Sequence, residues 1–401
     1  MNSRFDFLTG IVHIDADAPD EWAADAVLPV WARLNDPAWG DRLPRLLIHE
    51  TVHFWQLLGS GYLTRLVADE WHRLLMLEEN GTLLRESARV AAHRDRSVVP
   101  FAADELVEAW CRYWDVHIRG PVRVMAEEDL ERPAGPARPD LYSHTDYDLV
   151  MTQGPLEQLY ARPYRWLLDQ TGGDSLTCNA LFPFVVFTAF ASDDPVVFVR
   201  EAVSKLLKAD VVPLVRRCAA EQRYMINQVW LAIAETVLQQ HLGPLLVELS
   251  GPSLRMGSEL VGEPPLSDHP LLGPYAVKAA KPNFSLWAAY FYPSDPGDSP
   301  AYASELSRLA REGPVISQLT MPGQPWYRLT LGALVPPPVI RFRNFTWSAP
   351  VELEVGIPTG YRAKYGQTFA PAVEALERRA RYFRYAQEEI ALGLPIGTFP
   401  R

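Results

Sequence analysis

Residues 46–58, with the sequence LLIHETVHFWQLL, place the strongest constraint on what this chain can fold into. Apolar residues surround the few polar ones on every side, and a helix that is apolar all round must be buried. On such a helix His49 and His53 lie one turn apart on the same face, because they are four residues apart. Buried ionisable groups need a partner, and a metal ion bound by both imidazoles would be one. Pro44 suits the first helical turn, and residues 59–61 (GSG) suit its end.

Glu50 follows the first histidine directly and completes the arrangement His-Glu-x-x-His. A glutamate at this position can hold a water molecule beside the bound ion and act as its general base. The alternative is a buried helix whose histidines are satisfied by ordinary hydrogen bonds. The motif lies in a helix with a buried pattern rather than in a loop, which favours the metal. We therefore interpret His49 and His53 as metal ligands and Glu50 as the catalytic base.

A third protein ligand is required, because catalytic zinc usually takes three and leaves the fourth position to water. We prefer Glu108, whose helical stretch also carries Ala109 and Cys111, neighbours of small or modest size that let helices approach closely. Arg112 and Asp115 follow on the same side, where they could form hydrogen bonds that orient the ligands. The alternative for Glu108 is a solvated acidic helix face.

The sequence does not decide the roles of several other residues around the expected centre. Gln56 lies one turn beyond His53, where it either faces the centre or caps a buried hydrogen bond. Five other glutamates are alternative third ligands, namely Glu70, Glu79, Glu86, Glu157 and Glu235. The presence of each also has an ordinary structural explanation: a charged helix face, an exposed ion pair, stabilisation by a helix dipole, or burial. The residues that could stabilise an oxyanion are His117, His144, Tyr147 and Tyr160.

Composition and charge narrow the class of protein. A chain of 401 residues, 48% of them hydrophobic, can bury a large core as one large domain or two. The net charge of -11 argues against nucleic acid or an anionic membrane as the main partner. Three scattered cysteines do not make a disulfide framework. The N-terminus lacks the order of a signal peptide, and the longest apolar run, residues 180–191, is too short to span a bilayer. We expect a soluble, cytoplasmic protein with a peptide or small-molecule substrate, and its oligomeric state is left open.

The spacing of apolar residues predicts a mainly α (α+β) protein. Residues 1–250 are expected to form a helical, metal-binding catalytic region. Residues 251–401 are expected to pack on it as a smaller mixed part, with a Pro/Gly-rich segment, short strands and a C-terminal helix. The helices are expected at 21–34, 46–58, 62–79, 82–93, 102–118, 155–169, 175–191, 195–207, 212–242 and 371–392. The best strands are 10–14, 327–331 and 339–347, and residues 120–145 read as a long surface loop of the kind that often forms a lid.

The motif helix resembles the signature of the zincin metallopeptidases, and a glutamate ligand on a later helix would make the chain gluzincin-like. In that superfamily two histidines and a downstream carboxylate bind zinc, and the glutamate inside the motif activates water. The resemblance implies that His49 and His53 are ligands and that Glu50 is the base, on a helical zincin-like body. It extends loosely to residues 108–111 (EAWC), which approximate the Glu-Gly-x-Ala form around the third ligand. A third histidine at metzincin spacing does not follow His53.

These residues predict a zinc-dependent hydrolase that cleaves a peptide or amide bond. Zinc lowers the pKa of its water to roughly 7 and polarises the substrate carbonyl, and Glu50 takes the proton and passes it to the leaving group. Two histidines and a carboxylate also form the ligand set of mononuclear iron oxygenases, so an Fe²⁺ enzyme that tailors a small metabolite or peptide is the alternative.

Other classes have less support from the sequence. A di-iron protein is disfavoured because no second histidine has a glutamate three residues before it. A purely structural zinc normally has four protein ligands. The chain has no nucleotide-binding glycine motif and no Gly-x-Ser-x-Gly, so nucleotide cofactors and serine-hydrolase chemistry are unsupported.

Overall fold

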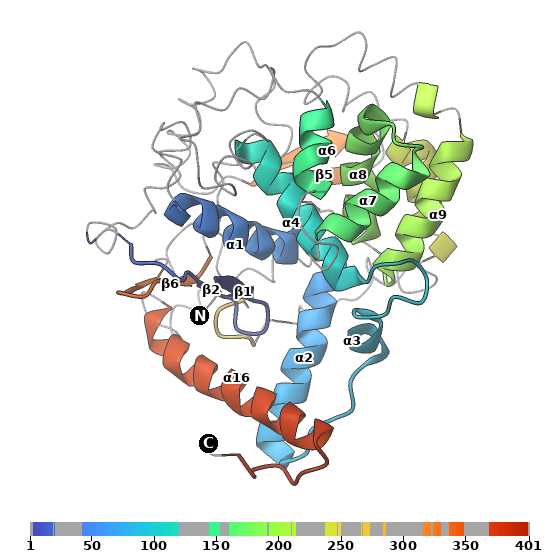
Figure 1. Cartoon of the computed structure of the whole chain (residues 1–401). Coiled ribbons are helices and arrows are strands. Elements are labelled where there is room, and N and C mark those ends of the chain that lie inside the picture. The colour runs from blue at the N-terminus through green and yellow to red at the C-terminus, as the bar shows by residue number, and fades with distance from the viewer. Residues whose placement is uncertain are drawn as a thin grey trace.

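Helices make up most of the chain that the structure describes, and the expected mainly α (α+β) fold is confirmed (Figure 1). The computed structural model describes residues 3–18, 20, 42–119, 144–152, 160–190, 192–209, 211–213, 237–246, 248–249, 266, 268–272, 284–285, 316–321, 324–329, 337–348 and 369–399.

Most of the described helices agree with the predicted ranges. Those before residue 250 are α1 (Arg42–Gly59), α2 (Gly61–Asn80), α3 (Ala88–Ala92), α4 (Ala103–Arg119), α6 (His144–Thr152), α7 (Ala161–Gln170), α8 (Ser175–Ala189), α9 (Pro195–Lys208) and the π-helical turn η5 (Leu238–Leu242). Near the C-terminus, α16 (Ala370–Ala391) matches the helix expected over 371–392. The predicted helix at 21–34, residues 120–143 of the predicted loop and most of the helix at 212–242 lie outside the described residues. The loop prediction is wrong at residues 144–145, which begin α6.

The prediction of one helix over residues 82–93 is wrong, because only α3 within it is helical. Gly81 ends α2 with a φ of 65°, a left-handed conformation that suits glycine. The chain then runs non-helically, and the carbonyl of Leu84 accepts a hydrogen bond from Arg73 Nε at 2.9 Å instead of from a helical amide. Ser87 starts α3 by accepting the backbone N–H of Val90 at 3.2 Å.

A small mixed sheet joins strands from both ends of the chain. Its order is β1 (Arg4–Asp6), β2 (Ile11–His13), β6 (Val339–Arg341) and β7 (Thr346–Ser348), and only the pairing of β2 with β6 is parallel. A second sheet has the order β3 (Phe284–Ser285), β5 (Gln324–Leu329) and β4 (Ile316–Met321). Strands from both sides of residue 250 therefore share the first sheet, and the predicted division at that residue stays a prediction.

The stretch 339–347 forms a hairpin of two strands, so the prediction of a single strand there is wrong. The backbone N–H of Phe342 donates to the carbonyl of Phe345 at 2.9 Å and closes the turn. Asn344 at its tip donates from Nδ2 to the Ala18 carbonyl at 2.7 Å and accepts the Ala18 N–H at 3.0 Å. A contact with a residue far away in the sequence thus fixes the position of the turn.

Helix α1 lies between α4 and the first sheet, as Figure 1 shows and its contacts with both elements agree. Leu47, Val52, Phe54 and Leu57 of α1 are buried. The expectation of a buried motif helix is confirmed at these positions. Because the helix is covered on opposite sides, its polar residues must find partners inside the protein.

The apolar helix α8 belongs to the core. Its Phe182 packs on Tyr113 of α4, with 5.2 Å between the ring centroids, and on Tyr164 of α7 at 5.1 Å. Among the residues that the structure describes, no helix combines the length and the apolar character that a bilayer crossing requires.

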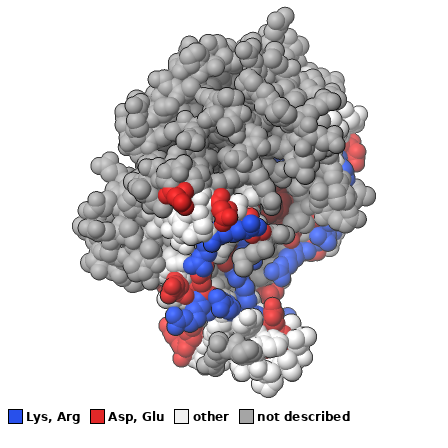
Figure 2. Space-filling model, turned by 60° about the vertical axis from the view of Figure 1, so that its left-hand side comes forward, with Lys and Arg blue, Asp and Glu red and all other residues white. Residues whose placement is uncertain are grey.

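Charges of both signs lie side by side on the described surface, as the face in Figure 2 shows. Many of them form ion pairs, including Arg65 with Asp193 at 3.0 Å and Arg341 with Glu377 at 2.8 Å. Exposed pairs of this kind contribute little to stability, so the core and the buried polar groups carry the fold.

His269 is one of these buried groups, and we expect it to make the protein less stable in acid. Its Nε2 donates to the Leu8 carbonyl at 2.7 Å, and its Nδ1 accepts the N–H groups of Leu271 and Leu272 at 3.1 and 3.0 Å. Burial lowers the pKa of His269 from 6.5 to about 4. The folded state therefore binds fewer protons than the unfolded state between these values, and the free energy of unfolding falls as the pH falls from 6.5 to 4.

The loss from His269 alone should be about 3 kcal/mol. Urea unfolding at several pH values measures it, with His269→Gln as the test variant and the exposed His72→Gln as the control. We expect a shallower pH dependence for His269→Gln between pH 6.5 and 4. An unchanged slope for His269→Gln would contradict this account.

Candidate metal centre

The two motif histidines of α1 converge on one carboxylate of α4. His53 Nε2 lies 3.5 Å and His49 Nε2 lies 3.8 Å from Oε2 of Glu108. The two imidazole rings are nearly perpendicular, at 85°, with their centroids 5.1 Å apart. Ligands at 2.0–2.2 Å from a tetrahedral zinc ion lie roughly 3.3–3.6 Å from one another. The two distances to Glu108 are close to this spacing, and the structure brings together the two histidines and the glutamate that the sequence favours.

Electrostatics favours a charged carboxylate at this position. Burial opposes the ionisation of Glu108, but the charge of His53 and hydrogen bonds from both imidazoles outweigh it, so the pKa of Glu108 lies below its usual value. Burial likewise opposes a charge on His53, but its contacts with Cys111 and Glu108 raise its pKa well above the usual value. Glu108 keeps 31% of its side chain exposed, so its carboxylate is not sealed inside the protein.

Glu50 is buried beside this group, with 6% of its surface exposed. Burial raises the pKa of its carboxyl, while the nearby His49 and His53 act in the opposite direction. A backbone hydrogen bond from Phe5 of β1 also reaches Glu50. The first sheet thus holds the predicted base from the side opposite α4. A carboxylate with a raised pKa is suited to exchange protons near neutral pH.

Gln56 fixes the orientation of His53. It both faces the candidate centre and satisfies a buried hydrogen bond, the two roles that its position in the sequence allows. Its Oε1 lies 2.8 Å from His53 Nδ1, and its Nε2 donates to the Val107 carbonyl of α4 at 3.0 Å. Because that amide nitrogen donates to Val107, the amide oxygen accepts the Nδ1 proton of His53. Nε2 of His53, which faces Glu108, is then the ring nitrogen that remains to bind a metal ion once its own proton is lost.

We expect Gln56→Leu to weaken metal binding about 10- to 100-fold, because it leaves the Nδ1 proton of His53 without an acceptor. The affinity is measured by competition with a chelating dye. Gln56→Glu retains the acceptor and should stay close to the parent, which separates positioning of His53 from a general loss of structure. Equal losses for both variants would contradict the positioning role.

Cys111 also belongs to the centre, and the sequence reasoning treated it only as a neighbour of modest size. Its Sγ lies 3.6 Å from His49 Nδ1 and donates to the His49 carbonyl at 3.1 Å. One ligand atom each from Cys111, His49 and His53 lies within 4.8 Å of the others. The sequence does carry a sign of this role, because Cys111 follows Glu108 by three residues and residues three apart share a helix face. A thiolate is also a common zinc ligand.

The other third-ligand candidates are not brought to this centre. Glu70 pairs with Arg73 and accepts Gln387 Nε2 at 3.1 Å, and both Glu79 and Glu86 are exposed. Glu157 and Glu235 lie outside the described residues.

The residues proposed for orientation and for the oxyanion are only partly described. Arg112 is buried, and its guanidinium lies 5.1 Å from the ring centroid of Tyr160. Tyr147 is buried on α6. The side chains of His117, His144 and Asp115 lie outside the description.

Comparisons with known proteins identify no relative of this chain, so the functional argument rests on the geometry of the site. No family model, no curated protein and no solved structure matches the chain, and the zincin resemblance stays a prediction.

Proposed function

We propose that this chain is a metal-dependent hydrolase of the His-Glu-x-x-His type that cleaves a peptide or amide bond. One observation carries the proposal, namely the convergence of His49 Nε2 and His53 Nε2 on the carboxylate of Glu108. This set of two imidazoles and one carboxylate is that of catalytic zinc sites that keep a fourth position for water.

Each residue then has a distinct task. Zinc held by His49, His53 and Glu108 would supply a Lewis acid and a water molecule of lowered pKa. Glu50 would serve as the base that moves a proton from water to the leaving nitrogen of the substrate, a task that its raised pKa supports. Gln56 keeps the Nδ1 proton on His53, so that Nε2 stays available for the ion.

A mononuclear iron oxygenase is the second candidate, because the same donor set describes iron sites that activate oxygen.

Metal analysis of protein purified without added metal tests the proposal. We expect about one zinc per chain, lost in His49→Ala and His53→Ala and retained in the exposed control Glu86→Gln. Stoichiometric iron would favour the oxygenase instead. Absence of any bound metal, together with full activity in Glu50→Gln, would exclude both.

Glu108 rather than Cys111 is expected to be the third ligand, because the Nε2 atoms of both histidines face Glu108, whereas Cys111 lies at Nδ1 of His49. Protein loaded with Co²⁺ should therefore lack a strong sulfur-to-cobalt charge-transfer band. Its visible spectrum should change in Glu108→Gln and remain similar in Cys111→Ser. A charge-transfer band in the parent that disappears in Cys111→Ser would assign the third ligand to Cys111.

A further inference from the structure

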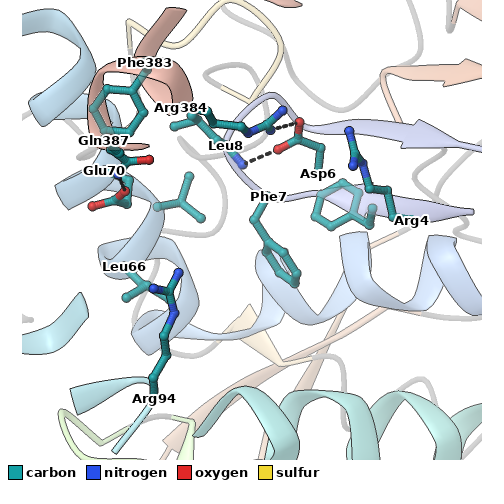
Figure 3. A pocket seen from close by; sticks show the side chains of 12 residues that line it. Arg4, Asp6, Phe7, Leu8, Leu66, Glu70, Arg94, Phe383, Arg384 and Gln387 are labelled. Atoms are coloured by element: carbon teal, nitrogen blue, oxygen red, sulfur yellow. Dashed lines mark hydrogen bonds and ion pairs between the residues drawn. The ribbon is translucent and has the colours of Figure 1, made fainter. Parts of the chain in front are cut away.

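A cavity of about 330 Å³ lies between β1, α2 and α16, next to the candidate metal centre but separate from it (Figure 3). Phe7 lines this cavity, and its ring packs edge-on against His53 with 5.9 Å between the centroids. Phe7 therefore stands between the cavity and the imidazole. The cavity volume lies at the lower end of the range for sites that bind small molecules.

Half of the residues that line the cavity are apolar, and they come from three elements and the turn after β1. They are Phe5, Phe7, Leu8, Leu66, Val67 and Phe383. A lining of this kind binds the apolar body of a ligand, while a few polar groups fix its orientation.

The carboxylates in the wall already have partners. Asp6 is buried, pairs with Arg384 and accepts the N–H of Leu8 at 3.2 Å. Glu70 pairs with Arg73 and also accepts a hydrogen bond from Gln387. Neither carboxylate is left to bind a cation.

Two arginines at the cavity, unlike these carboxylates, lack such partners among the described residues. Arg4 and Arg94 line it and are exposed, and within the described part of the chain neither guanidinium has an ion pair or hydrogen bond. In Figure 3 the side chain of Arg94 extends toward Leu66 at the apolar surface. Among the described residues, two cations without an ion pair thus lie at the edge of one cavity, in a chain with a net charge of -11.

We propose that this cavity binds a small carboxylate with an apolar body. The apolar part packs on Phe7, Leu66 and Phe383, and Arg94 holds the carboxylate. A guanidinium matches the planar geometry of a carboxylate and binds it through two hydrogen bonds. The apolar side chains of the lining favour an acid with an apolar body over inorganic phosphate, which has none. This binding does not rest on the proposed hydrolase activity.

Titration calorimetry of the full chain with 3-phenylpropionate tests the proposal, with 3-phenylpropan-1-ol as its uncharged counterpart and inorganic phosphate as the second anion. We expect saturable binding of the acid, and binding of the alcohol and of phosphate at least about ten-fold weaker. Arg94→Gln should weaken binding of the acid by about ten-fold or more. Leu66→Trp should abolish binding by filling the cavity while both arginines remain.

Exposed Arg85→Gln is the matched control and should bind the acid as the parent does. Metal content should be unchanged in Arg94→Gln, which separates this cavity from the metal centre. Equal binding of acid and alcohol, an Arg94→Gln variant that behaves like Arg85→Gln, or no saturation with acid up to about 10 mM would each overturn the proposal. Phosphate that binds as tightly as the acid would overturn the assignment to an apolar carboxylate.

Discussion

Glu50→Gln is expected to keep its metal and lose about 10²- to 10⁴-fold in the rate of peptide or amide hydrolysis. Glutamine has nearly the same shape as glutamate but cannot take a proton from water. His49, His53 and Glu108 remain in place, so the metal content should equal that of the parent. Turnover is measured by mass spectrometry on a mixture of peptides, because this readout requires no prior choice of sequence.

The exposed Glu86→Gln removes a carboxylate far from the centre and should cleave at the parental rate. Two outcomes for Glu50→Gln carry different meanings. Parental turnover would reject Glu50 as the base. Loss of metal along with activity would instead assign Glu50 a role in holding the centre together.

Glu105→Ala is expected to destabilise the protein by about 3–5 kcal/mol, the largest effect on stability that we predict. Glu105 is fully buried at the start of α4. Its Oε2 accepts Arg96 Nε at 2.9 Å and the backbone N–H of Ala102 at 2.8 Å, and its Oε1 pairs with Arg162 of α7. Alanine would remove a helix cap and leave the charge of Arg162, at the junction of α4 and α7, without its partner.

Urea unfolding at pH 7 gives the free energy of unfolding for this comparison. Glu105→Gln keeps the volume and one acceptor oxygen, so it should fall between the parent and Glu105→Ala. Glu86→Ala should lie within about 0.5 kcal/mol of the parent, as expected for an exposed site. A loss below 1 kcal/mol in Glu105→Ala would show that the arginines find other partners at little cost.

The sequence predicted the local part of the candidate site better than its tertiary part. His49, Glu50 and His53 share a buried helix, and the spacing of apolar residues reveals such a helix without knowledge of its neighbours. The small neighbours of Glu108 indicate close helix packing, and its carboxylate lies beside both imidazoles. The metal that these residues would hold stays a prediction.

Features that depend on how α1 and α4 are rotated against each other could not be read from the sequence. The distance from Cys111 to His49 and the two hydrogen bonds of Gln56 both depend on that rotation. Two of the errors in secondary structure have a similar origin. The spacing of apolar residues alone predicts a continuous helix over residues 82–93. In the structure, Ser87 and Arg89 instead form hydrogen bonds with Asp69 of α2, at 2.7 and 2.8 Å. Tertiary contacts outweighed local preference at these positions.

The pairing of β2 with β6 has a consequence for the order in which the protein assembles. β1 touches Glu50, β2 holds β1, and the far edge of β2 is covered by a strand more than three hundred residues later in the chain. While the ribosome is still translating, that edge of β2 has no partner and offers its backbone to any other strand. The helix pair that carries the two histidines and Glu108 can form early from nearby segments, but the surroundings of Glu50 are completed only after residues 339–341 have been synthesised. We therefore expect a nascent chain to be able to hold an ion before it is able to use one.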